Sequence, residues 1–114
     1  MRLEQTDTVD FLGFDKKTGD IQVTLIDDCD WGDEEAHLDL LRRKLERYFD
    51  FIESGEVHSR LREHGRTVLL ATPVNIQILA KCALPDEGER LISRAREVAV
   101  SIGSGLTWKR VGRT

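Results

Sequence analysis

Residues 67–80, TVLLATPVNIQILA, form an extended segment whose pattern decides the architecture predicted for the chain. Val74, Ile76 and Ile78 alternate with polar residues, which is typical of a strand that buries one face. Pro73 cannot donate a hydrogen bond to a neighbouring strand, so it marks a bend, an edge position or the start of the strand. The segment therefore predicts a sheet with one apolar face that must pack against a second layer.

A hairpin of two strands is predicted before this segment. Residues 8–14, TVDFLGF, and 21–26, IQVTLI, are rich in β-branched and aromatic side chains. They flank the sequence DKKTG, whose Gly19 suits the left-handed position of a short hairpin loop. Apolar and polar residues alternate along the second strand, so the pattern indicates an antiparallel hairpin with one buried face.

Two amphipathic helices are predicted, one before and one after the 67–80 segment in the sequence. Residues 33–54 carry apolar side chains at spacings of three and four, which predict a buried stripe of Leu38, Leu41, Leu45, Tyr48 and Ile52. Pro85 suits the first turn of the second helix. The stripe predicted for that helix is Leu91, Ala95, Val98, Ala99 and Ile102. Residues 56–65, EVHSRLREHG, predict a further short helical turn after the first helix.

A last strand at 106–111, LTWKRV, completes the order β-β-α-β-α-β. This order predicts an α+β two-layer sandwich with a four-stranded mixed sheet and two helices on one face. The connection through the second helix is long enough for a right-handed crossover, which favours a parallel pair for the last two strands. The predicted core consists of Val23, Leu25, Leu38, Leu41, Leu45, Ile52, Ile76, Ile78, Leu91, Ala95 and Val98.

Length and composition predict one domain over residues 1–114, with a net charge of −4. No stretch approaches the run of about 18 apolar residues that a membrane span needs. The first residues lack the apolar core of a signal peptide. Cys29 and Cys82 are far apart and are expected to be free thiols. A cytoplasmic protein that does not associate with a membrane is therefore expected.

Residues 27–35, DDCDWGDEE, place six carboxylates around Trp31. An EF-hand loop that starts at residue 27 would need oxygen ligands where the chain has cysteine, tryptophan and leucine. A loop that starts at residue 28 would place Asp33 where the required glycine belongs. The spacing therefore predicts no tight metal site, although a looser divalent-cation site stays open as an interpretation.

Two other interpretations of this stretch are a helix cap and a docking loop. Asp30 or Asp33 can cap the first helix, and acidic residues in its first turn face the positive end of the helix dipole. Capping leaves Asp27 and Asp28 without a structural reason. Residues 1–35 also hold 11 acidic residues against 3 basic ones, so an acidic patch can attract a basic partner. The candidate binding residues are Asp27, Asp28, Asp30, Trp31, Asp33 and Glu34.

The sequence predicts no catalytic residue and no cofactor. No GxSxG, P-loop, GxGxxG or HExxH motif is present, and His37, His58 and His64 are expected at the surface or partly buried. The basic run at 42–47 is expected to solvate an exposed helix face. Together with the negative net charge, that reading does not support nucleic-acid binding.

Three motifs resemble those of an uncharacterised family of small bacterial proteins, a domain of unknown function. Residues 7–15 fit D-x-[IV]-D-x-[IL]-G-[VF]-D, residues 30–38 fit D-W-x-D-E-E-x-H-L, and residues 51–55 read F-I-E-S-G. The resemblance covers almost the whole chain, but TVLLATP at 67–73 is longer and more apolar than the family pattern. It implies no reaction, cofactor or partner, and it marks the acidic stretch as a family feature.

The function predicted from these features is a non-catalytic protein-binding module, of the immunity or adaptor type. An acidic loop around Trp31 would bind an unknown basic protein, because tryptophan commonly anchors interfaces and carboxylates attract basic partners. The alternative is a small enzyme or a divalent-metal-binding protein that uses the carboxylates of 27–35. A C2 homodimer is also expected, because two helices cover only one face of the predicted sheet.

Overall fold

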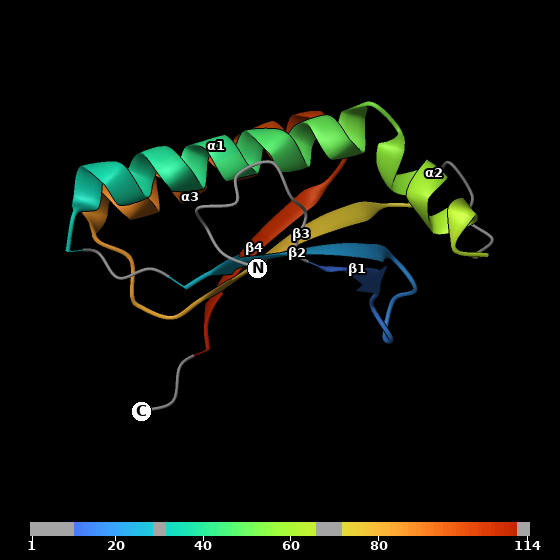
Figure 1. Cartoon of the computed structure of the whole chain (residues 1–114), viewed down its shortest axis with the longest axis horizontal. Coiled ribbons are helices and arrows are strands. Elements are labelled where there is room, and N and C mark those ends of the chain that lie inside the picture. The colour runs from blue at the N-terminus through green and yellow to red at the C-terminus, as the bar shows by residue number, and fades with distance from the viewer. Residues whose placement is uncertain (1–10, 29–31, 66–71, 112–114) are drawn as a thin grey trace.

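The computed structural model describes residues 11–28, 32–65 and 72–111, which form a helical layer packed on a sheet (Figure 1). The elements are β1 (Phe11–Phe14), β2 (Ile21–Asp27), α1 (Glu34–Glu53), α2 (Glu56–Glu63), β3 (Val74–Ala80), α3 (Asp86–Ser101) and β4 (Gly105–Arg110). The predicted α+β sandwich is confirmed. The short turn expected after α1 is a helix of eight residues, α2, which lies beyond one end of the sheet in Figure 1.

The sheet has the strand order β1-β2-β3-β4. β1 pairs antiparallel with β2 through the predicted hairpin, whereas β2, β3 and β4 are mutually parallel. Two crossover connections, through α1 and α2 and then through α3, proceed across the sheet in the same direction. Crossovers of the same hand therefore place α1 and α3 on the same face, where they lie next to each other.

The two faces of the sheet have different environments because buried and half-buried residues alternate along β2 and β3. Ile21, Val23 and Leu25 are fully buried beneath the helices. The opposite face carries a half-buried polar ladder, in which Thr24 lies beside Gln77 in register and their side-chain oxygens are 3.5 Å apart. The open face is polar over most of β2 and β3, but Ile26 and Leu79, which are paired in register, also lie on it.

Several predicted boundaries of helices, strands and the hairpin loop are confirmed. Asp33 is the N-cap of α1, since its Oδ1 accepts from the backbone N–H of Ala36 at 3.1 Å. Gly19 has a φ of 79° in the hairpin loop, as its position there requires. β3 starts directly after Pro73, whose carbonyl accepts from the N–H of Ile21 at 2.9 Å. Pro85 occupies the N-cap of α3 rather than its first turn.

The predicted core is correct for the strands but partly wrong for the helices. Val98 is 43% exposed, and Leu38, Ile52 and Leu91 are only partly buried. The buried residues of α1 are instead His37, Leu41, Lys44, Leu45, Tyr48, Phe49 and Phe51. Tyr48 is accommodated in this buried line because the sheet offers its hydroxyl a partner: the hydroxyl donates to the carbonyl of Thr24 at 2.7 Å.

Substitution of Leu45 tests this assignment of the core. Leu45 is 2% exposed, so Leu45→Ala leaves a cavity and should lower the free energy of unfolding by about 2–5 kcal/mol. Val98→Ala removes a largely exposed side chain and should change it by no more than about 0.5 kcal/mol. Urea denaturation of both variants measures the difference. Equal free energies of unfolding for the two would show that the helix faces are assigned wrongly.

Candidate functional site

The carboxyl end of β2 and the start of α1 are joined by a buried acid–histidine contact. Asp27, the last residue of β2, is 2% exposed, and His37 in α1 is 3% exposed. The Nε2 atom of His37 lies 2.8 Å from both carboxylate oxygens of Asp27. An imidazole N–H that donates to a carboxylate satisfies both groups where water cannot reach them.

This contact corrects the prediction that Asp27 belongs to an exposed acidic patch. The side chain of Asp27 faces the helical layer, so a partner protein cannot reach it. The contact with His37 also explains why an aspartate occupies position 27, which helix capping did not explain. His37 was expected at the surface or only partly buried, and its burial follows from the carboxylate that it meets.

The other candidate residues divide into an exposed group and a group outside the described ranges. Asp33 and Glu34 are exposed at the start of α1, as is the neighbouring Glu35, and Asp28 is half-buried. Asp30 and Trp31 lie outside the residues that the structure describes, so their membership of a docking loop stays a prediction. The exposed carboxylates lie at the N-terminal end of α1, where the helix dipole also favours negative charge.

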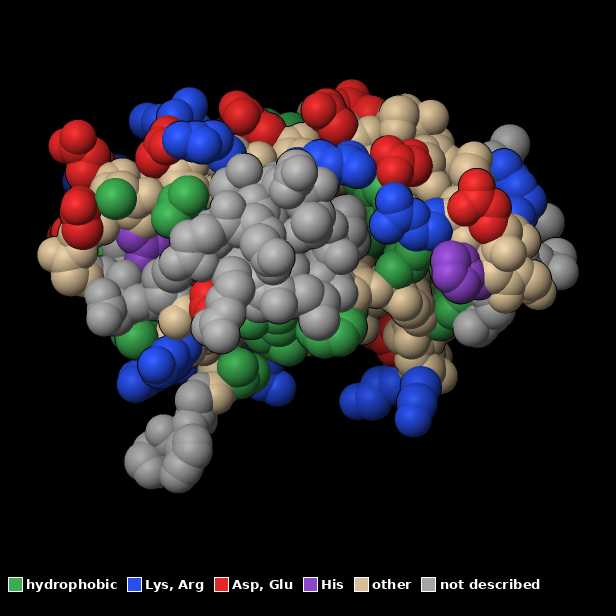
Figure 2. Space-filling view, in the orientation of Figure 1, with side chains coloured by type: hydrophobic (Ala, Val, Ile, Leu, Met, Phe, Trp, Pro, Cys, Tyr) green, Lys and Arg blue, Asp and Glu red, His purple; other side chains and the backbone are tan. Residues whose placement is uncertain are grey.

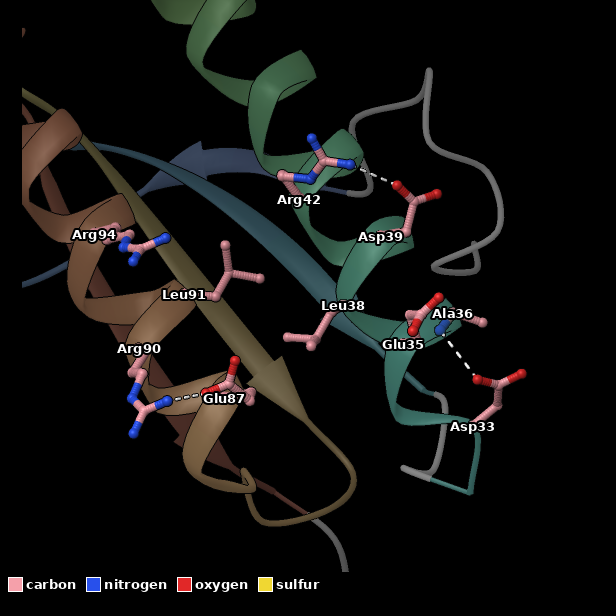
Figure 3. A pocket seen from close by; sticks show the side chains of 10 residues that line it. All are labelled: Asp33, Glu35, Ala36, Leu38, Asp39, Arg42, Glu87, Arg90, Leu91 and Arg94. Atoms are coloured by element: carbon pink, nitrogen blue, oxygen red, sulfur yellow. Dashed lines mark hydrogen bonds and ion pairs between the residues drawn. The ribbon is translucent and has the colours of Figure 1, made fainter.

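A groove extends from these carboxylates along the boundary between α1 and α3. Its first part has a volume of about 660 Å³ and includes Asp33 and Glu35 in its lining (Figure 3). Its second part, of about 460 Å³, continues along the two helices. The two parts share Arg42, Leu91 and Arg94, so they form one continuous surface.

The floor of this groove is apolar. Leu38 of α1 and Leu91 of α3 point toward one another between the helices (Figure 3). Further along, the lining includes Leu45, Phe49, Ala95 and Val98. Leu45, Phe49 and Ala95 are buried core residues that reach the floor from below. Leu38, Leu91 and Val98 were also predicted as core, but they are partly exposed because the two helices do not close completely over them.

The rim of the groove has more carboxylates than guanidinium groups. Among the described residues, seven acidic ones line it against three arginines: Asp33, Glu35, Asp39, Glu46, Asp50, Glu53 and Glu87 against Arg42, Arg90 and Arg94. Figure 2 shows acidic side chains spaced along this layer of the molecule. Hydrogen bonds from Arg43 and then Arg42 hold the pKa of Asp39 below its usual value, so this carboxylate is ionised. The groove therefore presents net negative charge around an apolar floor.

Features that suggest other chemistry are weaker. Within the described ranges, no group of three or more His, Cys, Asp or Glu side chains is arranged to hold a metal ion. No helix among those described is long and apolar enough to cross a membrane. The basic run at 42–47 was expected to be solvated, but Lys44 is fully buried. The run is therefore broken as a surface for nucleic-acid phosphates.

A double-mutant cycle tests whether Asp27 and His37 stabilise the fold as a pair. His37→Ala leaves a buried carboxylate without this donor and should lower the free energy of unfolding by about 3–5 kcal/mol. Asp27→Ala should cost a similar amount. The double variant should cost less than the two single variants added together, because the groups interact directly. Additive costs measured by urea denaturation would contradict a direct coupling.

Comparison with known proteins gives a family but no characterised relative. The family model DUF6572, described as a family of unknown function, matches residues 1–112. No curated protein and no solved structure matches the chain.

Proposed function

The chain belongs to DUF6572, and we propose that it is a non-catalytic protein-binding module of the immunity or adaptor type. The groove between α1 and α3 would bind a basic, amphipathic segment of a partner protein. The observation that carries this proposal is the combination of an apolar floor with an acid-rich rim in one continuous groove.

The dimensions of the groove suit a helical segment of the partner. Leu38 and Phe49 mark the ends of the apolar floor on α1, and a rise of 1.5 Å per residue separates them by roughly 16 Å. This length corresponds to about three turns of a helix laid along the groove. An amphipathic helix placed in an apolar groove is a common mode of peptide recognition, with anchors at every third or fourth residue.

The charges of the rim favour a partner segment of positive charge. Each exposed ion pair would add little affinity, but seven carboxylates against three arginines favour the approach of a basic segment and disfavour an acidic one. Asp28, Glu34 and the predicted loop residues Asp30 and Trp31 would extend the same acidic surface beyond the start of α1. Asp27 takes no part in it, because it is buried.

The alternative function, a small enzyme or a divalent-metal-binding protein, has less support. The contact between Asp27 and His37 resembles an acid–base pair, but both residues are at most 3% exposed, so a substrate does not reach them from solvent. Asp33, one of the exposed carboxylates of the acidic stretch, already accepts the hydrogen bond that caps α1. The module therefore accounts better for the exposed groups.

Two variants of α3 test whether a partner binds in the groove or elsewhere on the surface of this helix. Val98 lines the groove and is 43% exposed, whereas Val100 lies outside the groove lining and is 71% exposed. In a pull-down from the native host, Val98→Asp should reduce capture of a basic protein about tenfold or more, because it places a charge on the apolar floor. Val100→Asp adds the same charge and should leave capture unchanged.

The same pull-down tests the acidic loop and the salt dependence. Trp31→Ala/Asp28→Asn should weaken capture, and moderate salt should weaken it further, since exposed charges are screened over about 10 Å at 0.1 M. If wild type, Val98→Asp and Val100→Asp all capture the same proteins, the groove is not the binding surface. If Val98→Asp reduces capture but Trp31→Ala/Asp28→Asn does not, the stretch 27–35 does not bind the partner and serves only as the start of α1.

The C2 homodimer expected from the sequence stays a prediction. The open face of the sheet presents polar residues of β2 and β3, such as Gln22, Thr24 and Asn75, and few charges that would repel a second copy. Sedimentation at high protein concentration should give twice the 13.0 kDa mass of one chain. A species of 13.0 kDa at all concentrations would contradict self-association.

A further inference from the structure

The outer edge of β4 is an unpaired strand edge among the described residues, because β4 is the last strand of the sheet. The N–H of Val111, just beyond the strand, donates to the carbonyl of Ala80 at 2.8 Å and so points toward β3. Peptide groups alternate in direction along a strand. Those of Trp108 and Arg110 therefore point away from β3, toward the free edge.

The carbonyl of Leu106 supports this assignment of directions. It accepts a hydrogen bond from Nε of Arg96 on α3 at 3.3 Å, so it also faces away from β3. This contact covers the first outward carbonyl of β4. The outward peptide groups of Trp108 and Arg110 form no such bond with a described residue, and they can pair with an incoming strand.

A cavity lies beside this edge on the helical side of the sheet. It has a volume of about 350 Å³ and is lined in part by Leu84, Ile92 and Trp108. Its α3 residues, including Ser93 and Arg96, lie on the flank of α3 opposite to the α1 groove. A strand added to β4 would direct every second side chain to this side, so an apolar side chain would enter the cavity.

The β4 edge carries positive charge, in contrast to the groove. Arg96, Lys109 and Arg110 are all exposed. Neither Lys109 nor Arg110 forms an ion pair with a described residue. Of the cavity-lining residues that the structure describes, only Glu89 is acidic. Lys109 points to the open face of the sheet, because its partner in register is Leu79. Carboxylates on that side of an added strand would therefore meet a cation.

We infer that the β4 edge binds an extended segment of a partner protein in which apolar and acidic side chains alternate. The added strand would hydrogen-bond to Trp108 and Arg110, place an apolar side chain in the cavity and present carboxylates to Lys109. Strand addition of this kind takes affinity from backbone hydrogen bonds and specificity from pockets for alternate side chains. A second copy of β4 fits less well, because antiparallel pairing would bring two sets of Arg96, Lys109 and Arg110 together.

A designed peptide of alternating valine and glutamate tests this inference, with a peptide of alternating valine and lysine as its control. Amide hydrogen exchange is followed by NMR. The acidic peptide should slow exchange at Trp108 and Arg110 about tenfold or more, because these amides become hydrogen-bonded. Exchange at Thr107 and Lys109 should change little, since their amides already face β3.

Two variants of Arg110 separate the backbone contact from the charge. Arg110→Pro removes the outward N–H and the guanidinium group, and proline is tolerated at an edge where the N–H faces solvent. Arg110→Ala removes only the guanidinium group. The acidic peptide should bind Arg110→Pro about tenfold more weakly than Arg110→Ala. Val98→Asp alters the groove and should leave peptide binding at the β4 edge unchanged. The groove proposal and the β4 inference can therefore fail independently.

Three results would overturn the inference. If the lysine peptide binds with the same affinity as the acidic peptide, charge does not select the segment. Equal binding by Arg110→Pro and Arg110→Ala would show that no strand is added through this amide. In the absence of peptide, the amides of Trp108 and Arg110 could become more protected from exchange as the protein concentration rises. That result would show that a second copy occupies the edge.

Discussion

The buried contact between Asp27 and His37 is the interaction on which much of the structure depends. A carboxylate at 2% exposure is costly without a partner, and the Nε2 atom of His37 supplies one at 2.8 Å. The contact joins the end of β2 to the start of α1, and it requires that His37 face the sheet. Leu41, Lys44 and Tyr48 follow His37 on that side at helical spacing.

This rotation of α1 also produces the candidate binding surface. When His37 faces the sheet, Leu38 is turned about 100° around the helix and reaches the boundary with α3. There it meets Leu91, which is likewise turned away from the centre of the sheet. The groove and the buried acid–histidine contact therefore have a common cause, since the helix orientation that satisfies Asp27 leaves apolar side chains at the boundary between the helices.

The sequence predicted the elements well because the signals for them are local. Alternation along β2 and β3, the glycine at position 19 and the cap at Asp33 depend on residues within one turn or one strand. The buried face of α1 was predicted less well, because the chosen stripe included the partly buried Leu38 and Ile52 and omitted Phe49 and Phe51 as well as two polar residues. His37 and Lys44 are buried, and the partner of His37 lies ten residues away on another element. The groove was not predicted, since it joins Leu38 and Leu91 across the fold.

The two proposed surfaces differ in both charge and shape, and this difference bears on how partners are distinguished. The groove, with its acid-rich rim, suits a basic helix, whereas the β4 edge carries Lys109 and Arg110 and suits an acidic strand. A basic strand would be repelled at β4, and an acidic helix would be repelled at the groove. α3 contributes one flank to each surface. A segment bound on one side therefore does not cover the other, and the two sites can be occupied together.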